Sequence, residues 1–291
     1  MVSYSYPIQK VIVGDHIDLA YITIGEGTQT LLFVHGFASH IPVWEKNIHI
    51  LKKYYRCVAL DLPGHGFSAK KDYPYSIDFY AQTVRQFIEK LSLKDVVLIG
   101  HSMGGQIAIT LALQYAKLFS RLVLVAPAGF ETFNETEKQW LSRFTPGHVI
   151  ASSQYFRWVL NLKNYFYDLE PQEIAKLQDL NRDFFSLASN PYLHQILANS
   201  VRGMVQAPVF DLLPQLTLPT LVFFGKDDQL IPNKFLHPHL FSEQVARKGA
   251  GQIRASTLVL YNKAGHFLQY EQPSHFNIDL YKFLTPETFG P

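Results

Sequence analysis

Ser102 stands in the segment GHSMGG, which the apolar run VVLI precedes and the mostly apolar run QIAI follows. This pattern is typical of a sharp turn from a strand into a helix, which exposes a serine hydroxyl at the end of the strand. The residues two positions before and after the serine come close together in such a turn, and glycine removes the clash. We therefore interpret Ser102 as a candidate nucleophile whose turn is shaped by Gly100, His101, Gly104 and Gly105.

A serine hydroxyl needs a general base, and histidine is the usual one. The chain contains 12 histidines, so only their positions can discriminate among them. Sites in open α/β sheets form at the carboxyl ends of strands. His266 directly follows the last apolar run, His35 follows LLFV, and His101 lies within the serine motif. We select His266 as the base and interpret His35 and Gly36 as residues that shape their loop.

The base must be oriented by a carboxylate. The segment FFGKDDQLIP offers Asp227 and Asp228 at the end of another apolar run. We favour Asp228, three residues after Gly225, because the turn then carries it toward the neighbouring loop. Asp227 remains the alternative.

Attack on a carbonyl creates an oxyanion that needs two fixed hydrogen-bond donors. The backbone N–H of Met103, directly after the candidate nucleophile, is one candidate. The N–H of Phe37, in the loop after LLFVHG, is the other. We interpret His65, in DLPGHGFS, as a residue that braces a turn near this site.

Six short runs rich in Val, Leu and Ile must position these residues. Consecutive apolar residues are typical of strands that are buried on both faces of a parallel sheet. Segments with helical spacing separate the runs, including 76–93 behind the N-cap candidate Ser76, and 106–119. The runs QKVIVGD and IDLAYITIG predict an antiparallel hairpin at one edge. We therefore predict an α/β fold with a mainly parallel eight-stranded sheet and helices on both faces. The six runs cover 30–36, 57–64, 95–100, 121–129, 220–225 and 257–266.

Residues 130–210 interrupt this alternation, because they contain many aromatic residues and no clear strand. A crossover between parallel strands needs only about a dozen residues, so we predict an inserted helical cap here. Residues 1–129 and 211–291 would then form the core. The aromatic residues indicate an apolar pocket beneath the cap or simple packing of the cap on the core. Four arginines in this segment could bind a substrate carboxylate or could lie on the surface: Arg143, Arg157, Arg182 and Arg202.

Composition excludes several other classes of protein. The net charge of the 291 residues is only +2 and no run of Lys or Arg occurs, which argues against a nucleic-acid partner. The single cysteine, Cys57, cannot form an intrachain disulfide. The sequence begins without a signal-peptide pattern and contains no apolar stretch of about 18 residues, so we predict no membrane span and a cytoplasmic location.

Five segments together resemble the α/β-hydrolase superfamily, and specifically its capped serine-hydrolase branch. They are HGF (35–37), DLPGHGFS (61–68), GHSMGG (100–105), GKDDQLIP (225–232) and AGHFLQYEQP (264–273). The resemblance implies Ser102 as nucleophile, Asp228 as acid and His266 as base, in the chain order of that superfamily. It implies Phe37 and Met103 as the oxyanion-hole positions. Serine at position 102 argues against the haloalkane dehalogenase and epoxide hydrolase branches, which have aspartate there.

The resemblance implies an enzyme that cleaves a carboxylic ester, or a related acyl bond, of a small and largely apolar substrate. The reaction would pass through an acyl-enzyme on Ser102 and needs no metal and no organic cofactor. One alternative is a carbon–carbon bond hydrolase of a vinylogous diketone, which uses the same triad. Another is a ligand-binding receptor or scaffold on the hydrolase fold. The oligomeric state stays open.

Overall fold

The computed structural model describes residues 4–143, 161–186 and 188–285. Eight strands form one sheet in the order β1-β2-β4-β3-β5-β6-β7-β8. β1 and β2 pair antiparallel, as do β2 and β4, and all other neighbours are parallel. The predicted mainly parallel eight-stranded sheet and its edge hairpin are thus confirmed. The strands are β1 (Gln9–Val13), β2 (Ile17–Ile24), β3 (Thr30–Val34), β4 (Arg56–Leu60), β5 (Val96–His101), β6 (Phe119–Val125), β7 (Thr220–Gly225) and β8 (Ser256–Tyr261).

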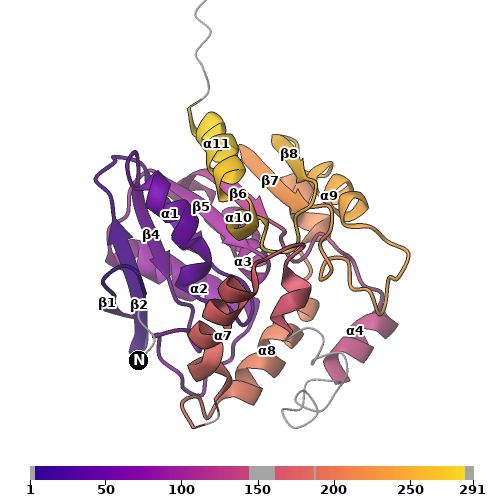
Figure 1. Ribbon diagram of the computed structural model, residues 1–291, viewed down its shortest axis with the longest axis horizontal. Helices are drawn as coiled ribbons and strands as arrows, with labels where there is room; N and C mark the ends of the chain where they lie inside the picture. The colour runs from indigo at the N-terminus through magenta and orange to yellow at the C-terminus, as the bar shows by residue number, and fades with distance from the viewer. Residues whose placement is uncertain (1–3, 144–160, 187, 286–291) are drawn as a thin grey trace, which may run out of the picture.

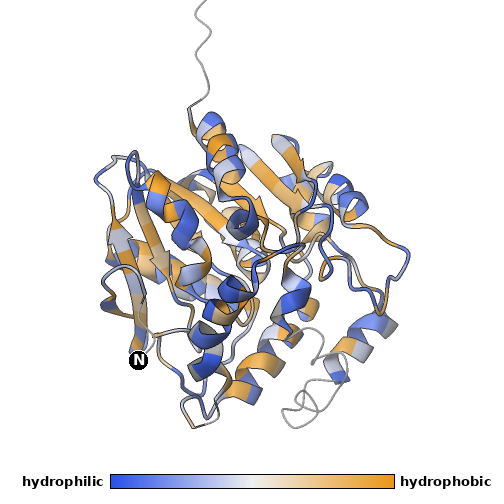
Figure 2. Ribbon diagram, viewed as in Figure 1, coloured by the Kyte–Doolittle hydropathy of each residue, from blue (hydrophilic) through white to orange (hydrophobic). Residues whose placement is uncertain are grey.

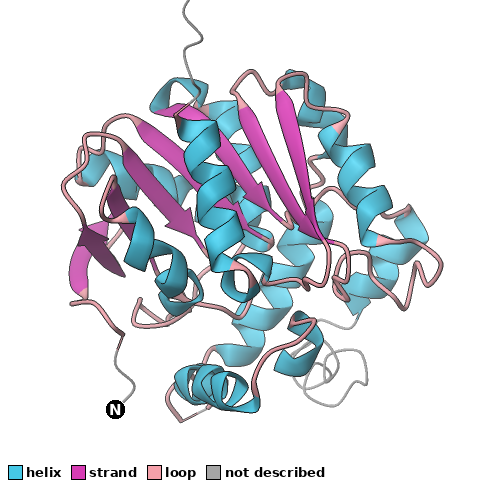
Figure 3. Cartoon of the chain, turned by 45° about the horizontal axis from the view of Figure 1, so that its top comes forward, coloured by secondary structure: helices cyan, strands magenta, loops and turns pink. Residues whose placement is uncertain are grey.

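The strands in the middle of the sheet are apolar at consecutive positions because helices cover both faces (Figure 3). Every residue of β3, β5 and β7 is buried. The two outermost strands differ, since β1 is mostly exposed and β8 is only partly buried. Hydropathy follows the same division, with apolar strands inside and mixed helices outside (Figure 2).

Two pairs of helices cover the sheet. α1 (Glu45–Leu51) packs against α11 (Pro273–Leu284), and α2 (Ile77–Lys90) packs against α3 (Met103–Gln114). α3 begins three residues earlier than the segment predicted from position 106. A further helix, α9 (Ser242–Ala250), packs on β7 and β8. The short helices of this part are η1 (Ile41–Trp44), η2 (Ala116–Leu118) and α10 (Leu268–Glu271).

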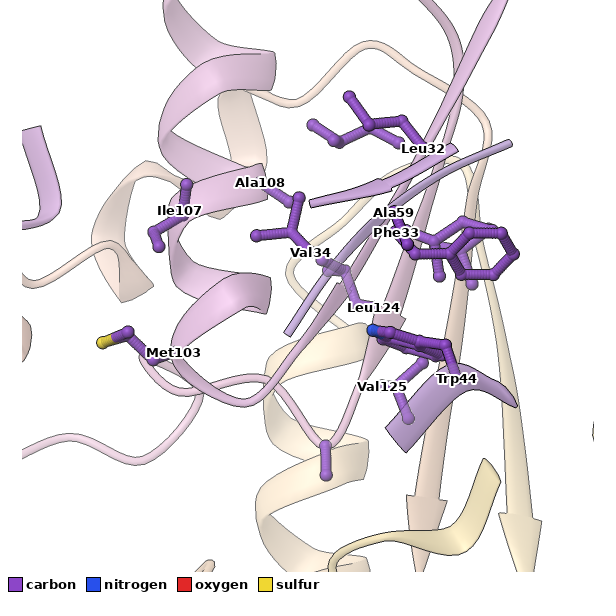
Figure 4. Packing of buried hydrophobic residues seen from close by; sticks show 14 of the residues in the cluster. Leu32, Phe33, Val34, Trp44, Ala59, Met103, Ile107, Ala108, Leu124 and Val125 are labelled. Atoms are coloured by element: carbon purple, nitrogen blue, oxygen red, sulfur yellow. The ribbon is translucent and has the colours of Figure 1, made fainter. Parts of the chain in front are cut away.

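The core is continuous from the sheet into these helices. Trp44 is fully buried, and its ring lies 5.2 Å from that of Phe33 and 6.4 Å from that of Phe276. Figure 4 shows Ala108 on the side of α3 that faces the strands and Ile107 on the opposite side, and both are buried. α3 is apolar nearly all round because the sheet lies on one side of it and other helices lie on the other.

The helices described between β6 and β7 come next along the chain. Residues 130–210, which we call the insertion segment, contain α4 (Glu135–Arg143), η3 (Leu162–Tyr165), α7 (Pro171–Phe185) and α8 (Leu193–Gln206). They lie at the end of the sheet toward which the parallel strands point (Figures 1 and 3). η4 (Phe210–Gln215) leads back to β7. The described part of the segment contains no strand. The domain limits at 130 and 210 stay a prediction.

A buried hydrogen bond of 3.0 Å between the hydroxyls of Tyr80 in α2 and Ser200 in α8 joins the insertion segment to the core. Several aromatic residues to which we attributed a packing role, and Arg157, lie outside the described residues. Within the described ranges, no helix combines the length and the apolar composition that crossing a membrane requires. The cytoplasmic location stays a prediction.

We expect Ser76→Ala to lower the free energy of unfolding by about 1 kcal/mol. The Ser76 hydroxyl accepts a hydrogen bond from the Phe79 N–H (3.1 Å) and so satisfies one of the free donors at the start of α2. Urea unfolding measures the difference. Ser76→Asp is the matched control, because it keeps an acceptor oxygen and should retain most of the stability. Equal losses in both variants would contradict the capping role.

Candidate active site

Ser102 lies where β5 turns into α3, and its backbone adopts the left-handed conformation with φ 54° and ψ −119°. A non-glycine residue in this region is strained, and such strain persists only where the surroundings hold it. The Ser102 N–H donates to the Val125 carbonyl (2.9 Å). The Ser102 carbonyl accepts from the N–H groups of Gly105 (2.8 Å) and Ala128 (2.9 Å). These bonds fix the turn to the end of β6 and to the loop that follows.

The glycines around Ser102 are required by close backbone contacts. A Cβ atom on Gly100 would lie 2.3 Å from the Gly104 carbonyl oxygen, and one on Gly104 would lie 2.4 Å from that of Val34. A Cβ on Gly36 would lie 2.9 Å from the Cβ of Ser102 itself. The glycine pattern in the sequence therefore has the physical cause that we inferred for it: α3 begins in direct contact with the ends of β3 and β5.

His266 and Asp228 meet in the interior, although 38 residues separate them in the chain. The His266 Nδ1 lies 2.8 Å from Asp228 Oδ2, and both side chains are almost completely buried. The other carboxylate oxygen accepts from the N–H groups of Leu230 (2.7 Å) and Ile231 (3.0 Å). With a hydrogen on Nδ1 facing the carboxylate, the Nε2 of the neutral ring is free to accept a proton. Asp227, the alternative acid, is only half-buried, and Asp228 is the one that contacts the ring.

The backbone of His266 is held on both sides. Its N–H donates to the Tyr165 carbonyl (2.7 Å), and its carbonyl oxygen lies 3.0 Å from the Nε2 of His101. The rings of His101 and His266 have centroids 4.8 Å apart. His101, which the sequence places in the serine motif, thus positions the loop of His266.

Ser102 and His266 line the same cavity, whose volume is about 260 Å³. Phe37 and His101 complete its wall near the serine. The remaining wall of the cavity comes from segments that are distant from Ser102 in the sequence. The described lining residues from the insertion segment and its flanks include Glu131, Phe133, Lys138, Leu141, Tyr165, Val201, Met204, Val205, Phe210 and Asp211.

The two candidate oxyanion donors are placed at this cavity in different ways. Met103 is the first residue of α3, so its N–H has no partner within the helix. Phe37 lines the cavity wall in the loop after β3. β3 lies between β4 and β5, so the strand order changes direction beside Ser102. Ligands bind at such switch points in open α/β sheets.

Four buried histidines other than His266 lie around the loops of the site. The Leu62 N–H donates to His35 Nε2 (2.9 Å), so the ring hydrogen is on Nδ1, which lies 2.7 Å from the Gly36 carbonyl oxygen. Burial lowers the pKa of His35 to about 4. His35 is therefore neutral at pH 7 and braces its loop, as the sequence indicates. Burial also lowers the pKa of His40 to about 3, and the pKa values of His65 and His101 fall well below their ordinary value for the same reason.

Asp61 is a buried carboxylate near the same loops. Asp61 Oδ1 accepts from the Ile41 N–H (2.9 Å), and Oδ2 accepts from the Phe67 N–H (2.8 Å) and the Tyr4 hydroxyl (2.9 Å). Burial raises the pKa of Asp61 to about 6, although these hydrogen bonds favour the ionised form. Asp61 fixes the segment that follows the Phe37 loop.

Sequence reasoning missed three residues at the site. Glu131 lines the cavity, and its carboxylate accepts from the Asn233 N–H (2.9 and 3.0 Å) and contacts His237 (2.5 Å). Tyr165 anchors the backbone of His266 through its carbonyl. Glu271 accepts from the Gly265 N–H (2.6 Å). The motif AGHFLQYEQP contains Glu271, but no residue type marks a backbone partner in advance.

The family model for the α/β-hydrolase fold matches residues 29–273, which is most of the chain. The chain belongs to this family. It is therefore a hydrolase of the α/β fold, in agreement with the resemblance seen in its motifs. The curated relatives include an uncharacterized hydrolase, YugF, of Bacillus subtilis (strain 168), which is 28% identical over 260 residues, or 85% of this chain and 86% of that protein.

Two further relatives carry names that concern specific chemistry. A thermophilic esterase from Thermogutta terrifontis has a solved structure with a TM-score of 0.72 and 25% identity, covering 96% of this chain and 98% of that one. A 2-hydroxy-6-oxononadienedioate/2-hydroxy-6-oxononatrienedioate hydrolase of Pseudomonas putida is 24% identical over 286 residues, or 92% of each chain.

Acidification should destabilise the protein. The lowered pKa values of His35 and His40 mean that the folded state binds fewer protons than the unfolded state below pH 6.5. The free energy of unfolding therefore falls as the pH drops from 7 to 5, and the raised pKa of Asp61 offsets only part of this loss. From His35, His40 and Asp61 together we expect a loss of about 2 kcal/mol, and His65 and His101 add to it in the same direction. Urea unfolding at the two pH values measures the change. An unfolding free energy that stays constant or rises at pH 5 would show that these rings are not held neutral.

Proposed function

We propose that this protein is a serine hydrolase that cleaves a carboxylic ester, or a related acyl bond, of a small, largely apolar and uncharged substrate. The observation that carries the proposal is the buried pair of His266 and Asp228, which opens on the same cavity as Ser102. An imidazole paired with a carboxylate beside a serine on a strained turn is the arrangement that activates a hydroxyl.

In the proposed mechanism, His266 Nε2 takes the proton of the Ser102 hydroxyl as the oxygen attacks the carbonyl carbon. Asp228 stabilises the imidazolium that forms. The N–H groups of Phe37 and Met103 hold the oxyanion, and each donor contributes about 3 kcal/mol to stabilisation of the transition state. His266 then gives the proton to the leaving alcohol, and water cleaves the acyl-enzyme by the same route. Apart from the substrate and water, every step uses groups of this chain, so the proposed mechanism requires neither a metal nor an organic cofactor.

The lining of the cavity supports an apolar, uncharged substrate. α8 contributes Val201, Met204 and Val205 to the wall. Apart from histidines, the charged side chains among the described lining residues are Glu131, Lys138 and Asp211. Lys138 forms an ion pair of 2.8 Å with the carboxylate of Glu135. The two carboxylates of the described lining outnumber this one cation, so the lining does not favour an anionic substrate. On this proposal, the insertion segment is the cap that selects the substrate.

The dienedioate hydrolase similarity supports a second candidate, hydrolysis of a carbon–carbon bond in a vinylogous diketone. A dienedioate carries two carboxylates, which a binding site would match with cations. The described arginines that we considered for this role, Arg143, Arg182 and Arg202, are exposed and are not among the described lining residues. Arg157 lies outside the described residues. We therefore rank ester hydrolysis first and separate the two by turnover of a ring-fission product against simple esters.

A ligand-binding receptor or scaffold is the alternative from another class. It needs a shaped cavity but no activated serine. The buried carboxylate–histidine pair supports an enzyme instead, because burying a carboxylate is costly and a purely structural role would not require it. Ligand binding that Ser102→Ala leaves unchanged, in a protein that hydrolyses no ester, would favour the receptor.

Labelling with a fluorophosphonate tests the proposed nucleophile. We expect the wild type to be labelled at Ser102, because the probe reacts with activated serines, and we expect Ser102→Ala to take no label. Mass spectrometry of the labelled peptide identifies the residue. A panel of nitrophenyl esters of graded chain length then defines the acyl preference. A wild type without label, or Ser102→Ala with as much label, would refute the proposal.

The two neighbouring aspartates provide a matched pair of variants. Asp228→Asn should lower kcat by about 10³–10⁴-fold, because an amide cannot stabilise the imidazolium and favours the wrong tautomer of His266. Asp227→Asn removes the same charge one residue away and should change kcat by less than about threefold. Steady-state hydrolysis of the best nitrophenyl ester measures both. Equal losses in the two variants would remove the assignment of Asp228 as the acid.

A further inference from the structure

The loop of His266 and the insertion segment are joined through one carboxylate. Glu271 Oε2 accepts from the Gly265 N–H (2.6 Å), directly before His266. Glu271 Oε1 accepts from the N–H groups of Tyr167 (2.6 Å) and Asp168 (3.3 Å). The side chain thus binds backbone groups of two segments that lie about 100 residues apart in the chain.

A second set of hydrogen bonds completes this junction. The Tyr165 carbonyl accepts from His266 N–H (2.7 Å) and Phe267 N–H (3.2 Å). The ring of Tyr165 lines the cavity, 6.3 Å from the ring of His266 between centroids. The insertion segment therefore supplies the backbone acceptor that holds the histidine, and Glu271 holds the segment that supplies it.

The carboxylate of Glu271 is well suited to hold the His266 loop and the insertion segment together. Burial raises its pKa, and the three N–H groups oppose this rise. Hydrogen bonds from N–H groups to an ionised carboxylate are shorter and stronger than those between neutral groups. An amide in place of the carboxylate has one acceptor oxygen, and its NH₂ would face a backbone donor. Replacing Glu271 by glutamine therefore breaks the connection on one side at little change in volume.

We propose that Glu271 is a positioning residue that aligns His266 by tying its loop to Tyr165–Asp168 of the insertion segment. The proposal rests on the proposed function, because alignment matters only if His266 is the base. A shift of the backbone at position 266 moves the imidazole relative to the Ser102 hydroxyl. A misplacement of about 1 Å can cost on the order of 100-fold in rate.

Glu173 provides the matched control. It also joins the insertion segment to the core, since its carboxylate pairs with Lys46 between α7 and α1 (2.7 Å). This ion pair is partly exposed, and Lys46 also lies over the ring of Tyr270. Among the described residues, Glu173 itself forms no hydrogen bond to Gly265 or His266. Surface ion pairs contribute little to stability, so Glu173→Gln removes a comparable link without moving the histidine.

The experiment compares the wild type, Glu271→Gln, Glu271→Asp and Glu173→Gln. For Glu271→Gln we expect fluorophosphonate labelling of Ser102 and kcat to fall by about 10–100-fold, with KM within about twofold. Glu271→Asp keeps the carboxylate and should recover part of the loss. Hydrogen exchange followed by mass spectrometry should be faster in the peptides that contain Tyr167 and Gly265. Glu173→Gln should resemble the wild type in every measurement.

The separate arms distinguish the ways in which the proposal can fail. Wild-type kcat and labelling in a Glu271→Gln protein with faster exchange would show that the connection exists but does not align the base. Unchanged exchange would show that Glu271 does not hold the two segments together. A loss confined to KM would assign Glu271 to substrate binding instead. A wild type that takes no label at Ser102 contradicts the proposed function itself, and the positioning role falls with it.

Discussion

The contact between the start of α3 and the end of β3 is the constraint on which the site depends. At Gly104, the backbone of the helix lies so close to the Val34 carbonyl that no side chain fits. This approach forces Ser102 into the left-handed region, at a cost of about 1–3 kcal/mol. The cost is met by the fully buried strands β3 and β5 and by the hydrogen bonds of Ser102 to Val125 and Ala128. The position of Ser102 at the cavity therefore depends on the packing of the sheet.

The histidine depends on a different set of contacts, because it lies on a loop. Its ring contacts Asp228, its N–H binds Tyr165 and its carbonyl contacts His101. These three partners come from the loop after β7, from the insertion segment and from the serine turn itself. The ring and the backbone are held separately, so the orientation of the imidazole and the position of its loop are two independent requirements. A buried carboxylate such as that of Asp228 tolerates no loose fit, since without its hydrogen-bond partners it would bear the full cost of desolvation.

The sequence predicts the parts of this arrangement that are encoded locally. The glycine spacing around Ser102 reflects contacts within a single turn, and the apolar runs reflect burial on both faces, so both are visible in one sequence. The sequence favours Asp228 over Asp227 because Asp228 lies three residues after Gly225. In the structure, Asp228 contacts the His266 ring. The start of α3 was misplaced by three residues, because glycines at 104 and 105 weaken the helical pattern although the backbone is already helical there. The catalytic roles remain proposals.

Contacts made through the backbone could not be predicted in the same way. The carbonyl of Tyr165 holds His266, yet any residue type has a carbonyl, so position 165 gives no signal in the sequence. Glu271 is visible as a residue but not as a connection, because its partners are N–H groups of a segment about 100 residues away. The separate roles of backbone and side chain at position 165 bear on which substrates the cavity can accept. Tyr165 lines the cavity, with its ring centroid 6.3 Å from that of His266, while its backbone carbonyl anchors the base. A substitution at position 165 can therefore reshape the cavity and leave the anchor of His266 in place, because the anchor does not depend on the side chain.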